Sequence, residues 1–386
     1  MKIFIFLTIV FLFVSNLCAQ VISPVTWHYY PSGALTKIGV TSWASGGTGV
    51  ANVLDATAGF ANPALKNSYK NLFHAEFGKR FETENALENW IKLDNQYLFP
   101  AFVAFSNSPY NKDFGLGYAH YDSDHIQATV FLPTIDSTDA SALTLIRNVD
   151  VHTFFISTRY EFSSKLAFGV NFGLNYSTLY MKLYNDYSKK GSGFGYQTTT
   201  GLVFTPTSTI NFSAAYRLNS DIEMSFSSKE FIAINPIDQL GSNENLIKMQ
   251  TIEEKHIAVF PHVFSVGAGI KLTQNWHYNL QIDFEKWAPL EEYYDDVFQF
   301  HTGTNYSASK NIIVMVGYFN QAHPDKSTSQ YYMQKFLTCG FLLKLPWRTN
   351  LSLALIDSHL FDNKQSDEKK DLYKQTYLTT GISFDY

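Results

Sequence analysis

Hydrophobic and polar residues alternate over long stretches of this chain. In LAFGVNFGLNYSTLYMKLY, residues 166–184, every second residue from Leu166 onward is apolar or aromatic with few exceptions, and the residues between are mostly small or polar. Successive side chains of a β-strand point to opposite faces, so this stretch predicts one strand with an apolar ribbon on one side. The same alternation recurs in four other stretches, at 210–217, 264–272, 276–285 and 350–355.

The length of the alternation favours a membrane barrel over a soluble sandwich. Soluble strands average about 5–6 residues, and residues 166–184 keep their alternation far longer. Roughly ten residues of ~3.3 Å, tilted by about 40°, span the ~25 Å apolar band of an outer membrane. Only a closed barrel leaves no unpaired strand edge in lipid. We therefore predict an all-β fold, a multi-pass transmembrane β-barrel in the cell outer membrane, with lipid covering the apolar ribbons.

The positions of the short turns predict the number of strands. Such barrels keep short turns on the periplasmic side, which fixes the parity of the count if both chain ends are periplasmic. About fourteen antiparallel strands result if 113–133 is one strand, interrupted at Asp122, Ser123 and Asp124 by a bulge or inward kink. The alternative is two strands there, at 113–121 and 124–133, and a misplaced strand elsewhere. The strands are expected at 71–81, 97–106, 113–133, 150–162, 165–184, 191–206, 208–219, 259–272, 275–288, 296–306, 310–320, 329–344, 347–357 and 371–385.

The N-terminus predicts export. Lys2 precedes an apolar run at 3–14, and the small residue Ala19 follows, as in a signal peptide over residues 1–19. The run is shorter than the ~20 residues of a spanning helix. A lipid-modified Cys18 is the alternative, but the residues before it fit that modification poorly.

Composition narrows the partners. The net charge of -5 argues against nucleic acid, and charged residues make up 16% of the chain against about 25% in soluble domains. We find no His, Cys, Asp and Glu spacing that suggests a metal site, and predict no cofactor. A hydrolase in the wall would need a Ser or Thr beside a His. The pairs His152–Thr153 and Ser358–His359 are strand neighbours that point to opposite faces, so we predict no enzyme.

Residues 20–70 precede the predicted barrel, which occupies residues 71–386. A barrel of this size is too wide for its own side chains to fill, so the segment is expected to form a hatch inside it. Glycines permit close packing against a wall, and a proline fixes a bend before the first strand. The candidate hatch residues are Gly47, Gly49, Asn62, Pro63 and Ala64.

These patterns together resemble a known family. Gly47-x-Gly49 followed by Asn62-Pro63-Ala64-Leu65 is similar to the N-terminal hatch of the FadL/TodX family of hydrophobic-compound transporters. The stretches 201–218 and 261–287 resemble that family's later hairpins, and TYLTTGISFDY resembles the C-terminal strand signal of outer-membrane proteins. The resemblance implies a fourteen-stranded barrel with a periplasmic-side hatch. It also implies capture of an apolar ligand by outer loops and sideways release beside a kinked third strand.

The longest predicted loop, 219–258, corresponds to a ligand-gathering loop of that family. Residues 244–256 could form a short amphipathic helix. The loop at 185–191 is short and rich in lysine, so the family's second capture loop is expected to be missing. The candidate capture residues are Phe231, Ile232, Ile234 and Ile237.

Three polar residues, His277, Asp283 and Glu285, are expected to face the lumen, where they either tune selectivity, bind a cation or are simply wetted. The leading prediction is a monomeric outer-membrane channel for hydrophobic small molecules, of the long-chain fatty acid or aromatic hydrocarbon type. A PorV-like component of type IX protein secretion, whose partners would be secreted proteins and other secretion components, is the alternative. An open diffusion porin would leave the N-terminal segment without a role. The lumen distinguishes a transporter from a secretion component, because a transporter needs a continuous apolar path from the outer loops to the side gap.

Overall fold

The structure is a computed structural model, and it describes residues 38–65, 71–86, 91–107, 112–132, 141–183, 187–233, 247–258, 260–288, 294–322, 333–358 and 375–385. The predicted signal peptide at 1–19 lies outside the described residues, as do residues 20–37 of the predicted hatch.

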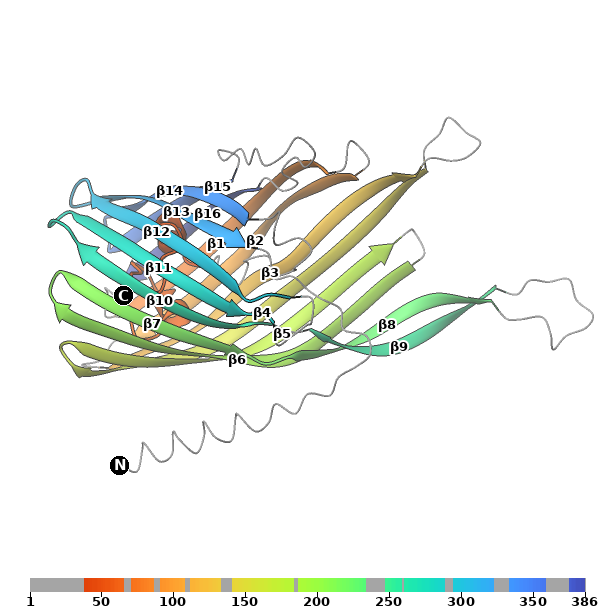
Figure 1. The fold of residues 1–386 in the computed structure, drawn as a ribbon, viewed down its shortest axis with the longest axis horizontal. Coiled ribbons are helices and arrows are strands. Elements are labelled where there is room, and N and C mark those ends of the chain that lie inside the picture. Colours follow the sequence, from red (N-terminus) through yellow and green to blue (C-terminus); the bar gives the residue numbers. More distant parts are fainter. Residues whose placement is uncertain are drawn as a thin grey trace, which may run out of the picture.

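Fourteen antiparallel strands close into a barrel (Figure 1). β1 pairs with β16, and β5 pairs with both β4 and β6, so the ring has no open edge. The barrel strands are β1 (Asn71–Ala86), β2 (Ile91–Asn107), β3 (Lys112–Leu132), β4 (Ser141–Ser163), β5 (Leu166–Leu183), β6 (Tyr187–Thr207), β7 (Ile210–Asn219), β10 (His262–Lys271), β11 (Trp276–Lys286), β12 (Val297–Ser307), β13 (Ile312–Ala322), β14 (Met333–Leu345), β15 (Thr349–Asp357) and β16 (Gln375–Asp385).

The predicted strand count is confirmed, and so is the single third strand. β3 runs unbroken from Lys112 to Leu132, and its pairing with β4 shifts register between Asp122 and Asp124. This shift is the β-bulge expected at those polar residues.

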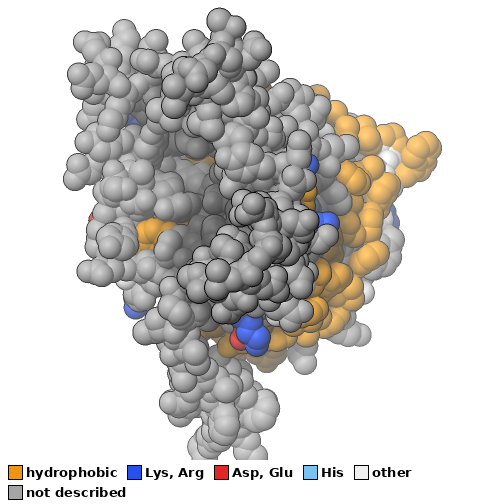
Figure 2. Space-filling model, turned by 90° about the vertical axis from the view of Figure 1, so that its right-hand side faces the viewer, with side chains coloured by type: hydrophobic (Ala, Val, Ile, Leu, Met, Phe, Trp, Pro, Cys, Tyr) orange, Lys and Arg blue, Asp and Glu red, His pale blue; other side chains and the backbone are white. Residues whose placement is uncertain are grey.

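Side chains alternate between the lumen and the exterior as predicted. On β4, Phe154 is 58% exposed on the outside, and its neighbour Phe155 is 3% exposed on the inside. Hydrophobic side chains cover the flank of the barrel visible in Figure 2. Aromatic residues stand exposed beside the short turns, as an interface girdle requires; examples are Phe162, Trp276, Tyr306 and Trp347.

The predicted loop at 219–258 is wrong for most of its length. β8 (Ile222–Ala233) and β9 (Ile247–Ala258) form an antiparallel hairpin that continues β7 and β10 beyond the barrel (Figure 1). Residues 247–256, expected to be helical, belong to β9. The loop predicted at 185–191 is likewise shorter, because β6 begins at Tyr187.

Two short helices precede the barrel, α2 (Val40–Ala44) and α3 (Ala58–Ala61). We call residues 38–65, which contain both, the inner segment. No helix in the described part of the chain has the length and apolar character to cross a membrane.

Candidate functional site

The inner segment lies in the lumen, close against the wall around most of its circumference. Its backbone approaches wall glycines so closely that a Cβ atom would collide with it. A Cβ on Gly169 of β5 would lie 2.2 Å from Pro63, and one on Gly303 of β12 would lie 2.1 Å from Ser45. A similar backbone approach joins Gly317 to Gly46, and a Cβ on Gly340 or Gly267 would meet the side-chain Cβ of Ala44 (2.7 Å) or Ala51 (2.9 Å). The wall is therefore shaped to receive this segment.

Buried acidic groups anchor the start of the inner segment to β1. The Glu76 carboxylate accepts hydrogen bonds from the backbone N–H groups of Gly39 (2.9 Å) and Val40 (2.8 Å). His74 lies 2.8 Å from the same carboxylate and 2.7 Å from the Ser383 hydroxyl on β16. Asp55, His74 and Glu76 each have an atom that could bind a metal ion, and these three atoms lie within 4.8 Å of one another. These groups join the inner segment to the seam where the barrel closes.

The carboxylates of this cluster already have donors. Asp55 accepts from the hydroxyl of Thr41 at 2.6 Å and from the backbone N–H of Thr57 at 2.9 Å. Anchoring therefore accounts for the cluster. Sequence spacing did not reveal it, because Asp55 meets His74 and Glu76 only through the fold.

The predicted hatch residues fix the other end of the segment. The Asn62 side chain donates to the carbonyl of Val50 at 3.0 Å and accepts from the N–H of Ala64 at 3.1 Å. The Ala64 carbonyl then accepts from Nε of Arg159 at 2.9 Å. Asn62 thus staples two parts of the segment together, and Pro63 rests on the wall at Gly169.

Gly47 and Gly49 occupy the middle of the inner segment. Gly47 has a positive φ of 76°, which favours glycine, and it lies against the ring of His301. Gly49 faces the Ser42 hydroxyl. All five predicted hatch residues therefore make specific contacts, at two separate places.

The three predicted lumen residues lie on the inward face of β11, as expected from their spacing. Asp283 is buried and lies 3.1 Å from Nε2 of His301 on β12, whose Nδ1 lies 2.9 Å from the carbonyl of Gly46. Glu285 accepts from the indole N–H of Trp287 at 2.8 Å. His277 is half-buried nearer the short turns. The carboxylates therefore contribute to seating the inner segment and ordering the wall.

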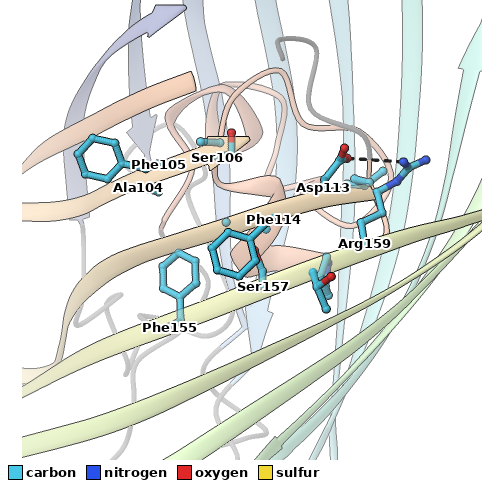
Figure 3. A pocket seen from close by; sticks show the side chains of 14 residues that line it. Ala104, Phe105, Ser106, Asp113, Phe114, Phe155, Ser157 and Arg159 are labelled. Carbon is cyan, nitrogen blue, oxygen red and sulfur yellow. Dashed lines mark ion pairs between the residues drawn. The ribbon is translucent and has the colours of Figure 1, made fainter. Parts of the chain in front are cut away.

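Two small cavities lie between the inner segment and the described wall. One, shown in Figure 3, lies beside the Asp113–Arg159 ion pair (3.5 Å) and Phe155, and its volume is about 20 Å³. A second, next to Gly47, Phe60 and Asp283, measures about 50 Å³. A single water needs roughly 10–15 Å³ on this measure. Both cavities hold a few waters at most and neither accommodates a hydrocarbon.

A continuous apolar cluster connects the outer hairpin to the inner segment. It starts at the inward face of β8 with Ile222, Met224 and Phe226, and passes Leu179 of β5 and Val151 of β4. It ends in an aromatic group in which the ring centroids of Phe60 and Phe155 are 5.3 Å apart, and those of Phe102 and Phe155 are 5.6 Å apart. We call this cluster the apolar path.

The apolar path ends at an interruption in the barrel wall. β2 and β3 pair from Phe102 with Ala119 to Asn107 with Phe114, and again from Ile91 with Val130 to Leu93 with Ala128. Within the described strands, residues 94–101 of β2 and 120–127 of β3 are not paired with each other. The bulge of β3 lies in this stretch, as does Pro100, which has no backbone N–H to donate. We call this interruption the β2–β3 gap.

The predicted capture residues are not brought to the apolar path by the described structure. Phe231 and Ile232 belong to the outer part of β8. Ile234 and Ile237 lie outside the described residues, as does His359 of the excluded Ser358–His359 pair. In the other excluded pair, Thr153 is fully buried in the lumen and donates to Asn175, whereas His152 faces outward.

Sequence reasoning missed the wall glycines and the apolar path residues Phe102 and Phe155. A signal for the glycines exists, because Gly169, Gly267 and Gly269 fall on the inward face of long alternating strands. Their meaning emerges only when the inner segment is seen against them.

No protein family model and no curated protein matches the chain by sequence. Solved structures do match it. The toluene transporter TodX from Pseudomonas putida superposes with a TM-score of 0.71 at 14% identity, covering 91% of this chain and 99% of that one. The monoaromatic hydrocarbon channel CymD gives 0.61 at 13% identity, covering 90% and 97%. A Pseudomonas aeruginosa FadL homologue gives 0.60 at 10% identity, covering 90% and 98%. The chain therefore has the fold shared by TodX, CymD and the FadL homologue over almost its whole length.

Proposed function

We propose that this protein is an outer-membrane channel for hydrophobic small molecules, of the monoaromatic hydrocarbon or long-chain fatty acid type. The observation that carries the proposal is the apolar path, which begins at the outer hairpin and ends at the β2–β3 gap. The shared fold with TodX, CymD and a FadL homologue supports it.

The route follows from where apolar side chains line the lumen. A hydrophobic solute gains free energy by leaving water, by about 25 cal/mol for each Å² of apolar surface. Between Phe226 and Phe102 it would meet apolar side chains in succession. The inner segment stands across the lumen at Phe60, so a straight passage into the periplasm is blocked.

The β2–β3 gap provides the exit in this proposal. Phe102 and Ala119, the last paired residues before the gap, are both buried members of the apolar path. A solute arriving there would pass sideways between the two strands into lipid, without crossing the polar contacts of the inner segment. Residues 20–70 act as the hatch, residues 1–19 as the signal peptide, and a single copy of the chain holds the whole route.

The alternative, a PorV-like secretion component, needs an outer docking surface for secreted proteins and has no use for an apolar path. The path and the gap therefore favour transport. A secretion component would bind its cargo protein without moving hydrocarbons.

The test is uptake of toluene and of a long-chain fatty acid by vesicles containing the full chain. Phe155→Gln places an amide in the apolar path, and desolvating it costs about 1–3 kcal/mol, so uptake is expected to fall by about tenfold. Phe154→Gln is the matched control, since this neighbour faces outward and should leave uptake near the wild-type rate. If wild-type vesicles take up no more than empty ones, the transport proposal is wrong and cargo-protein binding becomes the next measurement.

A further inference from the structure

A groove on the outer face of the barrel lies where β8 leaves the wall. It has a volume of about 880 Å³ and is lined mainly by outward-facing residues of β5, β6, β8 and β9, and its lining also includes Leu179 and Phe226 of the apolar path. We call it the outer groove; its polar lining includes Thr178, Tyr180, Lys190, Ser192, Ser225 and Lys255. Small-molecule sites commonly occupy about 300–1,000 Å³, so the groove is large enough for a sugar-sized group.

The groove is built into the fold at the point where β7 ends. Ser220 and Asp221 interrupt the strand before β8, and Asn219 donates to the carbonyl of Pro261 at 2.7 Å across the same break in the partner strand. The Ser220 hydroxyl accepts from the backbone N–H of Tyr196 at 2.8 Å, which holds the break against β6. β8 and β9 then extend beyond the neighbouring strands (Figure 1).

The outward row of β5 places the groove at the edge of the bilayer. Phe172 and Leu174 are 48% and 49% exposed and belong to the apolar exterior. From Tyr176 onward the row becomes amphipathic and polar. Tyr176 packs on the exposed Phe194, with ring centroids 4.9 Å apart. Aromatic residues of this kind mark the membrane–water interface. The short turns and the C-terminus lie at the opposite end, so this is the outer leaflet.

Positive charge gathers at this level. Lys182, Lys190 and Lys255 all stand on the outward face, and the Lys190 ammonium lies 5.4 Å from the centre of the Tyr180 ring. Among the side chains that the structure describes, two carboxylates are nearby and each has a partner. Glu223 lies 2.5 Å from Lys255, and Asp150 lies 3.0 Å from His120. Hydroxyl groups of serine and tyrosine stand between the lysines.

We propose that the outer groove binds the phosphorylated saccharide headgroup of an outer-leaflet glycolipid. The lysine ammonium groups would bind phosphate, and the serine and tyrosine hydroxyls would hydrogen-bond the sugar. The acyl chains of the same lipid would lie below, along Phe172, Leu174 and Phe194. The polar headgroup would thus lie in the polar groove at the membrane–water interface, and the acyl chains would lie against the apolar exterior within the bilayer.

The experiment measures binding of bisphosphorylated lipid A to the purified full-length protein in detergent, by native mass spectrometry with titration. Lys190→Gln with Lys255→Gln should weaken binding by about tenfold or more, because charge-assisted contacts to phosphate are lost. Dephosphorylated lipid A should bind the wild type as weakly. Glu223→Gln should bind the phosphorylated lipid more tightly, since it frees Lys255 from its carboxylate.

Lys271→Gln with Lys344→Gln is the matched control, because it removes two exposed lysines at the short-turn end. Its binding should equal that of the wild type. Heat-dependent migration on gels confirms that each variant retains its barrel. Equal binding by the groove variant and the wild type, equal binding of the dephosphorylated lipid, or an equal loss in the control would each overturn the proposal.

Discussion

At the scale of single residues, the contact between the inner segment and the wall depends on the absence of side chains. Gly169, Gly303 and Gly317 each lie where the backbone of the inner segment would collide with a Cβ atom. Polar side chains then hold the segment. Glu76 of the wall accepts hydrogen bonds from two of its backbone N–H groups, and Asn62 within the segment binds two of its own backbone groups. The seat is therefore specific to this segment.

Gly169→Ala is expected to displace the inner segment, because the new methyl group would meet the Pro63 backbone at 2.2 Å. Overpacking of this kind costs about 1–3 kcal/mol. Hydrogen exchange of residues 58–65 should become faster. Gly173→Ala on the same strand is the control, since its methyl group would meet only the wall side chains of Thr153 and Gln197. Equal exchange rates in the two variants would contradict the proposed seat.

Pro63→Gly tests the bend at the end of the inner segment. Replacing proline adds conformational freedom to the unfolded chain, worth about 0.4–1 kcal/mol, and releases the restraint on Asn62. We expect a small but measurable leak of hydrophilic solutes such as arabinose into vesicles. Unchanged permeability would show that the hydrogen bonds of Asn62 hold the bend without the proline.

At the scale of elements, the strands that face lipid were predictable and the rest was less so. Lipid requires an apolar side chain at every second position, so β5 and β11 could be placed within a few residues. The outer hairpin of β8 and β9 rises beyond the apolar exterior, where nothing imposes that alternation. Its polar stretch at 247–256 was therefore mistaken for a helix.

The site was predictable in part, for a similar reason. The local sequence was enough to select Asn62 and Pro63 as candidate hatch residues, and to predict that Asp283 faces the lumen. The anchor formed by Asp55 with His74 and Glu76, and the meeting of Phe60 with Phe102 and Phe155, depend on contacts between distant segments. No periodicity within a segment reports such contacts.

The bulge in β3 provides an element-scale prediction. β3 keeps the same register with β2 on both sides of the gap, so the bulge bends β3 without shifting that register. Deleting Ser123, the residue that the β3–β4 pairing skips, should straighten β3 and narrow the β2–β3 gap. Uptake of toluene should then drop towards that of empty vesicles while the barrel remains folded. Deleting Phe162, the residue skipped between β4 and β5, is the control and should leave uptake intact. Normal uptake without Ser123 would show that the exit is elsewhere.

At the scale of the whole molecule, the barrel wall and the inner segment have different roles, one towards lipid and the other towards water. The wall separates lipid from the lumen, and in the proposed function the inner segment closes the lumen to water; two cavities beside it measure about 20 and 50 Å³. An open fourteen-stranded barrel would conduct ions and small solutes.

Removing residues 38–61 should convert the protein into an open pore. Planar bilayer recordings should show a stable conductance that the wild type lacks, and vesicles should admit hydrophilic sugars. The control is Lys344→Gln, which alters an exposed wall residue at the short-turn end and leaves the inner segment in place. A closed bilayer after the deletion would mean that the wall itself, and not the inner segment, seals the lumen.

The contacts of the inner segment also dictate an order of assembly. Its partners extend from Gly169 on β5 to Thr338 on β14, which is 292 positions from Gly46, and its anchor His74 bonds to Ser383 on the final strand. Contacts between residues so distant in the sequence form late, because the entropy cost of closing a long loop must be met before the contacts can stabilise the fold. The inner segment contains the first of the described residues to be synthesised. It is nevertheless expected to reach its native position last, after β1 and β16 have paired and closed the barrel. A folding intermediate would be an unplugged, leaky cylinder.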